Sequence, residues 1–230
     1  MFPLRDTVRS RTFPLVNYGL IAANVLVFIF QSSLSPRALE QFMGFFALTP
    51  ANLSLAAPWT WLTLFSSMFM HGSWFHLISN MWMLYIFGDN VEDRMGSGRF
   101  LVFYLLAGLA AAFAQVAVMP DSQIPTVGAS GAIAGVLGAY FLLYPHARVI
   151  TFIPVFILPW LIQVPAILYL GVWFLSQLSS GLLSLGAAGQ FGGIAWWAHI
   201  GGFVFGLILV HLFTRRRRTK EWYADEYWPY

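Results

Sequence analysis

Six apolar stretches, each nearly free of charge, constrain this chain more than any other feature of its sequence. A bilayer core requires about 20 apolar residues per helix, and with only 9% charged residues the chain cannot cover such stretches with water-facing side chains. The sequence therefore predicts an all-α membrane protein, with residues 1–230 forming one domain, a bundle of six transmembrane helices. The predicted spans are about 15–31, 74–88, 100–118, 130–144, 164–183 and 195–213.

Two of the segments between these spans are also apolar. Residues 32–72 contain two aromatic, apolar runs, so we expect this first loop to lie in the membrane interface or against the bundle. Residues 149–162 are apolar but interrupted by Pro154 and Pro159, and we expect an interfacial or re-entrant segment there.

The basic residues indicate the orientation. With six spans and both termini inside, eleven of the 12 Lys and Arg residues fall on the inner side, as the positive-inside rule requires, and only Arg37 falls outside. A seventh span at 149–162 would put the four arginines at 215–218 opposite the N-terminus, so we reject it. Because no transit-like N-terminus is evident, we expect a prokaryotic plasma membrane, with the N- and C-termini cytoplasmic.

The fourth span is too short to cross the hydrocarbon core. Only about 15 residues fit between Ser130 and Pro145, roughly 22 Å of helix against a core about 30 Å thick. The helix should therefore begin below one membrane surface. Ser130 would then lie at the floor of a water-filled recess that opens to the outside.

Polar side chains within the spans are few, and such residues are usually functional. His76 and Asn80 are four residues apart, so they project from one face of the second helix, and His199 lies near the outer end of the sixth. Together with Ser130, they supply a hydroxyl, a histidine base and oxyanion donors for acyl transfer. No Asp or Glu lies at this depth, so we predict a Ser130–His199 dyad. The predicted oxyanion donors are His76, Asn80 and the backbone N–H of Ser130.

Glycines at four-residue spacing follow both catalytic candidates. Gly131 and Gly135 follow the serine, and Gly202 and Gly206 follow the histidine. Small residues at this spacing allow helices to approach closely, so we expect the fourth and sixth helices to pack along them. Taken alone, each polar or glycine motif is more often structural, and it is their coincidence at compatible depths that favours catalysis.

These motifs resemble those of the rhomboid family of intramembrane serine proteases. They are His71-x4-His76-x3-Asn80 in the second span, Gly128-Ala129-Ser130-Gly131 in the fourth and Ala198-His199-x2-Gly202-x3-Gly206 in the sixth. The match is specific in its order and covers the chain after about residue 15. The resemblance implies a six-helix bundle with a membrane-embedded first loop, Ser130 as nucleophile, His199 as general base, and His76 and Asn80 in the oxyanion hole.

The resemblance also implies membrane-anchored protein substrates, cut in or near a transmembrane segment within the lipid bilayer. We expect no cofactor, metal ion or nucleic-acid partner, and the oligomeric state stays open, a monomer included. Glu92, in the short loop expected after the second span, resembles the acidic loop residue that stabilises the family's bundle, and we interpret it as structural. Two departures from the family's pattern are visible. The Trp-Arg pair often found in the first loop is absent, since no arginine neighbours Trp59 or Trp61. Ala134 stands where an aromatic residue often packs against the histidine.

Two other functional classes remain as alternatives. A proteolytically inactive relative would bind membrane proteins and direct their trafficking or degradation, but such proteins typically lack the serine or the histidine. A transporter or channel should show paired charges within spans or an internal repeat, and the halves 15–118 and 130–213 share no pattern. The sequence leaves open the substrate and whether the fifth span or the first loop moves to admit it.

Overall fold

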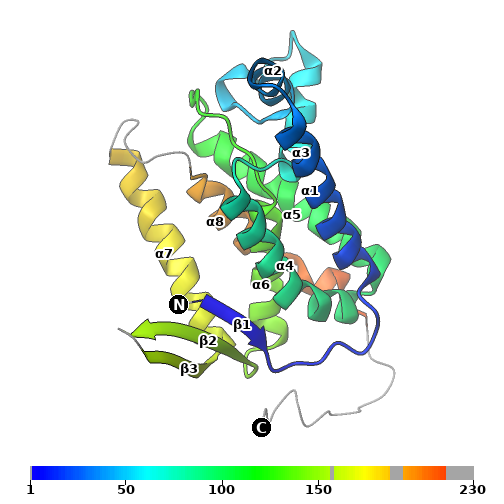
Figure 1. Ribbon diagram of the computed structural model, residues 1–230, viewed down its shortest axis with the longest axis vertical. Coiled ribbons are helices and arrows are strands. Elements are labelled where there is room, and N and C mark those ends of the chain that lie inside the picture. Colours follow the sequence, from blue (N-terminus) through cyan, green and yellow to red (C-terminus); the bar gives the residue numbers. More distant parts are fainter. Residues whose placement is uncertain (1, 156–157, 187–193, 216–230) are drawn as a thin grey trace.

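The computed structural model of the chain describes residues 2–155, 158–186 and 194–215. Within these ranges, six long helices run along the molecule, and each begins within three residues of a predicted span (Figure 1). Their bounds are Leu15–Ser33 (α1), Trp74–Met95 (α4), Ser97–Val118 (α5), Ser130–Leu143 (α6), Ala166–Gly186 (α7) and Trp196–Phe213 (α8). Arg216, Arg217, Arg218 and Lys220, used above for the orientation, lie outside the described residues.

Among the described helices, four are long and apolar enough to cross a membrane: α1, α5, α7 and α8. Helix α6 is apolar but has only 14 residues, and α4 carries charged residues in its second half. The chain is therefore a mostly helical membrane protein. That all six helices cross the bilayer stays a prediction.

The first loop is built from short helices at one end of the molecule (Figure 1). They are α2 (Pro36–Phe46), α3 (Thr63–Ser66) and the 3-10 turns Pro50–Asn52, Pro58–Leu62 and Ser67–Phe69. Large apolar side chains of this loop are exposed, among them Phe45, Leu55, Trp59 and Leu62. Such a surface suits lipid better than water, so it supports the expectation of an embedded loop without testing it.

The all-α class is wrong in one respect, because a small antiparallel sheet lies at the other end of the molecule (Figure 1). Its strands, in the order β1-β2-β3, are β1 (Phe2–Asp6), β2 (Arg148–Val155) and β3 (Leu158–Pro165). Most of the expected interfacial or re-entrant segment 149–162 is thus a hairpin, in which Pro154 pairs with Pro159. β-branched residues such as Val149 and Thr151 favour strands, and prolines, which cannot donate to the ladder, stand together near its turn.

Glu92 joins the end of α4 to the start of α1. It lies within α4 rather than in a loop, and it is 1% exposed. Its carboxylate accepts hydrogen bonds from the backbone N–H groups of Val16 (3.1 Å) and Asn17 (2.7 Å) and from the hydroxyl of Ser97 (2.6 Å). Because the N-cap residue Pro14 makes no side-chain cap, this carboxylate caps α1 from another helix, as a structural role requires.

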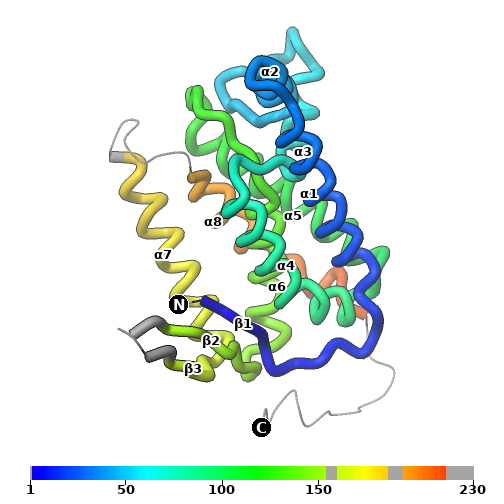
Figure 2. Tube along the Cα trace, viewed as in Figure 1, coloured from blue at the N-terminus to red at the C-terminus, as the bar shows by residue number. Residues whose placement is uncertain are grey.

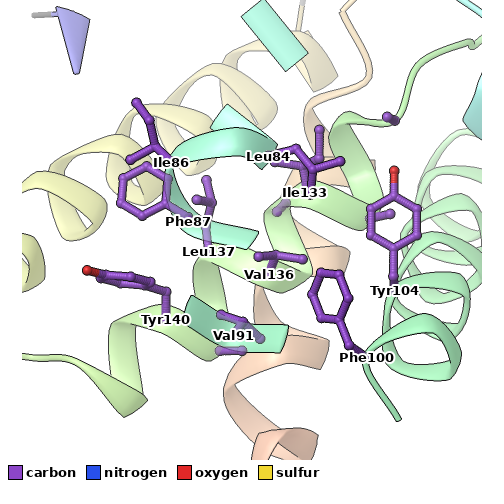
Figure 3. Close-up of a cluster of buried hydrophobic side chains, with 14 of the residues drawn as sticks. Leu84, Ile86, Phe87, Val91, Phe100, Tyr104, Ile133, Val136, Leu137 and Tyr140 are labelled. Atoms are coloured by element: carbon purple, nitrogen blue, oxygen red, sulfur yellow. The ribbon is translucent and has the colours of Figure 1, made fainter. Parts of the chain in front are cut away.

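The core lies where α4, α5 and α6 meet, and Figure 3 shows side chains from all three helices packed there. Every residue from 131 to 140 of α6 is buried. Helix α6 is therefore the central helix, enclosed by α4, α5 and α8, whereas α7 lies at the edge of the bundle (Figure 2). A polar group at the start of α6 is consequently positioned by a helix that is buried over ten consecutive residues.

Candidate active site

Glycines bring the backbones of α6 and α8 into contact. A Cβ atom at Gly202 would collide with the carbonyl oxygen of Gly131, and one at Gly206 would collide with that of Gly135. A third such contact was not expected from the sequence: a Cβ atom at Gly138 would collide with the carbonyl oxygen of Phe203. Backbone-to-backbone packing of this kind fixes the relative height of the two helices.

This packing places Ser130 beside His199. Ser130 is the first residue of α6, and its Oγ lies 2.8 Å from Nε2 of His199 on the second turn of α8. The chain enters α6 through Gly128, whose positive φ of 128° favours glycine and whose N–H donates to the carbonyl oxygen of Ser67 at 2.9 Å. A serine hydroxyl in this position can transfer its proton directly to the imidazole.

His76 and Asn80 line the same cavity, which has a volume of about 440 Å³ and also holds Ser130 and His199. A Cβ atom at Gly128 would lie 2.8 Å from His76 Nε2 and 3.6 Å from Asn80 Nδ2, so both side chains face the turn before the serine. Asn80 Nδ2 is buried and has no hydrogen-bond partner among the described residues. A buried donor without a partner is costly, and here it borders a cavity in which a ligand oxygen could accept from it.

The hydrogen-bond partner of His76 indicates which ring nitrogen carries the proton. The backbone N–H of Gly72 donates to His76 Nδ1 over a long 3.5 Å contact. With Nδ1 as the acceptor, Nε2 bears the hydrogen and is a donor on the side facing Gly128.

Three further residues surround His199, and sequence reasoning missed all of them. Gln177 Oε1 lies 2.7 Å from His199 Nδ1. The ring of Trp173 lies 6.0 Å from the imidazole and that of Trp196 lies 6.3 Å away, perpendicular to it. Two aromatic rings therefore flank His199, although position 134 offers none. Gln177 was detectable in the sequence as an amide within an apolar helix, four residues after Trp173 and so on the same face.

His71, the first residue of the motif that continues with His76 and Asn80, is buried. It is 2% exposed, and its ring lies 5.1 Å from that of His76. The side chain of Gln31 on α1 makes two hydrogen bonds with the backbone of His71, both at 3.2 Å. Its Nε2 donates to the carbonyl oxygen, and its Oε1 accepts from the N–H. His71 therefore packs edge-on against the ring of His76.

A family model for the rhomboid domain matches residues 58–216. This chain belongs to the rhomboid family. The human presenilin-associated rhomboid-like protein, mitochondrial, is 30% identical over 195 residues, which are 82% of this chain and 46% of that protein. Rhomboid protein 1, mitochondrial, of Saccharomyces cerevisiae is 28% identical over 196 residues, 83% of this chain and 51% of that protein. Rhomboid protease GluP of Bacillus subtilis is 35% identical over 127 residues, 55% of this chain and 24% of that protein.

The relatives correct the expected location of this rhomboid. Those that match more than four fifths of the chain are mitochondrial proteins by name, which overturns the expectation of a prokaryotic plasma membrane with cytoplasmic termini. The chain spans about half the length of these relatives. Among the described residues, no group of three or more His, Asp or Glu side chains is placed to hold a metal ion.

Proposed function

We propose that this rhomboid is an intramembrane serine endopeptidase that hydrolyses peptide bonds in or near transmembrane segments of other membrane proteins. The observation that carries the proposal is the 2.8 Å contact between Ser130 Oγ and His199 Nε2 inside a cavity that also holds Asn80. Membership of the family and similarity to a protein named a rhomboid protease support it.

In the first half of the reaction, Ser130 Oγ attacks the carbonyl carbon of the scissile bond while His199 Nε2 accepts the hydroxyl proton. The resulting tetrahedral intermediate carries its negative charge on the former carbonyl oxygen. His199 then returns the proton to the leaving amine, the C–N bond breaks, and an acyl group remains on Ser130. In the second half, water attacks the acyl carbon while His199 Nε2 accepts its proton. The bond between the acyl carbon and Ser130 Oγ then breaks, His199 returns the proton to Oγ, and the new carboxyl terminus is released.

The oxyanion of each intermediate needs donors that are already in place. We assign this role to Asn80 Nδ2, His76 Nε2 and the backbone N–H of Ser130. The amide nitrogen of Asn80 lacks another partner among the described residues, and the first N–H groups of a helix have no acceptor within the helix. The positive end of the α6 dipole points the same way, so all these groups favour negative charge at one place.

The cavity must receive a peptide segment from the membrane while water reaches the serine. Helix α6 has 14 residues, about 21 Å, so its first residue lies below one surface if its end reaches the other. Leu48 of the first loop and Thr126 of the connector before α6 line the cavity. We infer that the recess opens on the membrane side opposite the sheet. The names of the long-matching relatives favour a mitochondrial membrane.

A serine-directed reagent tests the proposal. The purified protein in mild detergent is treated with a fluorophosphonate, and the adduct is located by mass spectrometry. We expect one adduct, on Ser130, which Ser130→Ala abolishes and His199→Ala reduces at least about 10³-fold in rate. Ser79→Ala is the matched control, because Ser79 lines the same cavity but its hydroxyl donates to the backbone carbonyl of His76.

Absence of an adduct on Ser130 in folded protein would overturn the proposal. The chain would then be grouped with the inactive relatives that bind membrane proteins, and Ser130 would be a helix-packing residue. An adduct on Ser79 or spread over several serines would show that the reagent reports exposure rather than an activated nucleophile.

A further inference from the structure

We propose that Gln177 is a positioning residue that holds His199 in the tautomer able to act as a base, an inference that rests on the proposed function. Gln177 lies on α7, 22 positions before His199 in the sequence, and its Oε1 is 2.7 Å from His199 Nδ1. The Ser130–His199 pair thereby extends to three side chains from three helices: α6, α7 and α8.

A directional chain of hydrogen bonds fixes the orientation of the Gln177 amide. The hydroxyl of Ser176 donates to the carbonyl oxygen of Trp173 at 2.6 Å, which leaves the oxygen lone pairs of Ser176 free to accept. Gln177 Nε2 donates to that oxygen at 3.0 Å. The amide nitrogen is thus turned towards Ser176, and the amide oxygen is turned towards His199.

This orientation determines the tautomer of His199. An amide oxygen can only accept, so the hydrogen of the neutral imidazole must lie on Nδ1. The Nε2 lone pair is then directed at the Ser130 hydroxyl, 2.8 Å away. If the amide of Gln177 were reversed, its NH2 would face Nδ1, the hydrogen would move to Nε2, and His199 would be unable to accept the serine proton.

Burial makes the contact a strong constraint. Gln177 is 7% exposed on a helix that is apolar enough to cross a membrane, and a buried polar group there is stable only when it is hydrogen-bonded. Trp173, one turn earlier on α7, packs its ring against the same imidazole. Helix α7 therefore holds His199 both by a hydrogen bond and by an aromatic face (Figure 1 shows α7 beside α8).

Gln177 also acts during the reaction. When His199 takes the serine proton it becomes an imidazolium, and its Nδ1–H donates more strongly to the Gln177 oxygen. A neutral amide stabilises this cation less than a carboxylate does. Loss of the acceptor removes one hydrogen bond to a charged group, so we expect it to slow acylation by about 10- to 100-fold.

The kinetic test compares two variants of similar size at position 177. Gln177→Leu removes the acceptor, whereas Gln177→Glu keeps an oxygen that can accept from Nδ1–H. We expect Gln177→Leu to lower kcat and the fluorophosphonate labelling rate of Ser130 by about 10- to 100-fold with little change in KM. Gln177→Glu should stay within about tenfold of the unmodified protein, because a carboxylate oxygen makes the same contact.

A matched control separates positioning from folding. Gln115 is also a buried amide on an apolar helix, 6% exposed on α5. It does not line the cavity of Ser130 and His199, whose side-chain hydrogen bonds among the described residues go to each other and to Gln177. Gln115→Leu should leave the labelling rate unchanged. The inference is overturned if Gln177→Leu labels at the normal rate, or if Gln177→Glu is as slow as Gln177→Leu.

A spectroscopic test decides the same question without catalysis. In protein labelled with ¹⁵N at histidine, the signals of His199 are identified by their loss in His199→Ala. We expect an Nδ1–H tautomer in the unmodified protein and a change towards Nε2–H in Gln177→Leu. An Nε2–H tautomer in the unmodified protein would refute the positioning role. If Ser130 does not label at all, the proposed protease function fails, and this spectrum still decides the role of Gln177.

Discussion

Replacing Glu92 with glutamine tests whether one carboxylate anchors α1 to the bundle. Glu92 is 1% exposed and accepts three hydrogen bonds. One oxygen accepts from the N–H of Val16 and the hydroxyl of Ser97, and the other accepts from the N–H of Asn17. In glutamine the amide oxygen can replace the first of these two carboxylate oxygens. The NH2 group then faces the N–H of Asn17, and neither of these two donors can accept from the other.

The cost follows from what the substitution removes. One buried hydrogen bond to a charged acceptor contributes about 1.5–3 kcal/mol. The negative charge at the start of α1 contributes about 0.3–1 kcal/mol more through the helix dipole. We therefore expect Glu92→Gln to lower the free energy of unfolding by about 2–4 kcal/mol, from the sum of these two contributions.

Unfolding of the purified protein in detergent micelles, followed by tryptophan fluorescence, measures this loss. Asp93→Asn is the matched control. Asp93 accepts from the N–H and hydroxyl of Thr12 through a single oxygen, in an exposed setting, and an asparagine keeps that oxygen. We expect a change within about 0.5 kcal/mol there. Equal losses in the two variants, or a loss below about 1 kcal/mol for Glu92→Gln, would refute the capping role.

Three further predictions concern the site, the helix packing and the N-terminal strand. Asn80→Ala should lower kcat by about 10²–10³-fold with little change in KM, measured with a peptide substrate that the unmodified protein cleaves. An unchanged kcat would show that Asn80 is not an oxyanion donor. Gly206→Ala should lower the free energy of unfolding by about 1–3 kcal/mol, because the added Cβ atom would meet the carbonyl oxygen of Gly135. Gly98 has open space around it, so Gly98→Ala should leave the free energy of unfolding unchanged or raise it slightly in the same assay. Burial raises the pKa of Asp6 from 3.8 to about 7, so the folded chain keeps a proton that the unfolded chain releases. The free energy of unfolding should therefore fall as the pH rises between these values, and Asp6→Asn should reduce that slope.

The positions of the long helices were predictable because apolar runs end where charge, glycine or proline appears. Helix α6 begins at Ser130 and α4 begins at Trp74, as the sequence indicates. The charged turn after the second span was misread as a loop. It continues α4, because Glu92 finds its partners at the start of α1, far away in the sequence.

The sheet and the surroundings of His199 were less accessible. The hairpin at residues 148–165 was interpreted as membrane-associated because its apolar residues and prolines outweighed its strand propensity, and pairing with β1 depends on a contact across the whole chain. Gln177 was overlooked because the search for a third catalytic group considered only acidic residues. Which nitrogen of His199 faces Ser130 depends on side-chain orientations that no sequence pattern encodes.

Peptide hydrolysis inside a bilayer is the most direct test of the central claim. The purified protein is reconstituted in phospholipid vesicles with a transmembrane peptide that has small residues and a helix-breaking segment, and the products are weighed by mass spectrometry. We predict two fragments whose masses sum to that of the peptide plus one water, absent with Ser130→Ala and with His199→Ala. An intact peptide with folded, unmodified protein whose Ser130 also fails to label, or equal cleavage by the Ser130→Ala variant, would contradict the account.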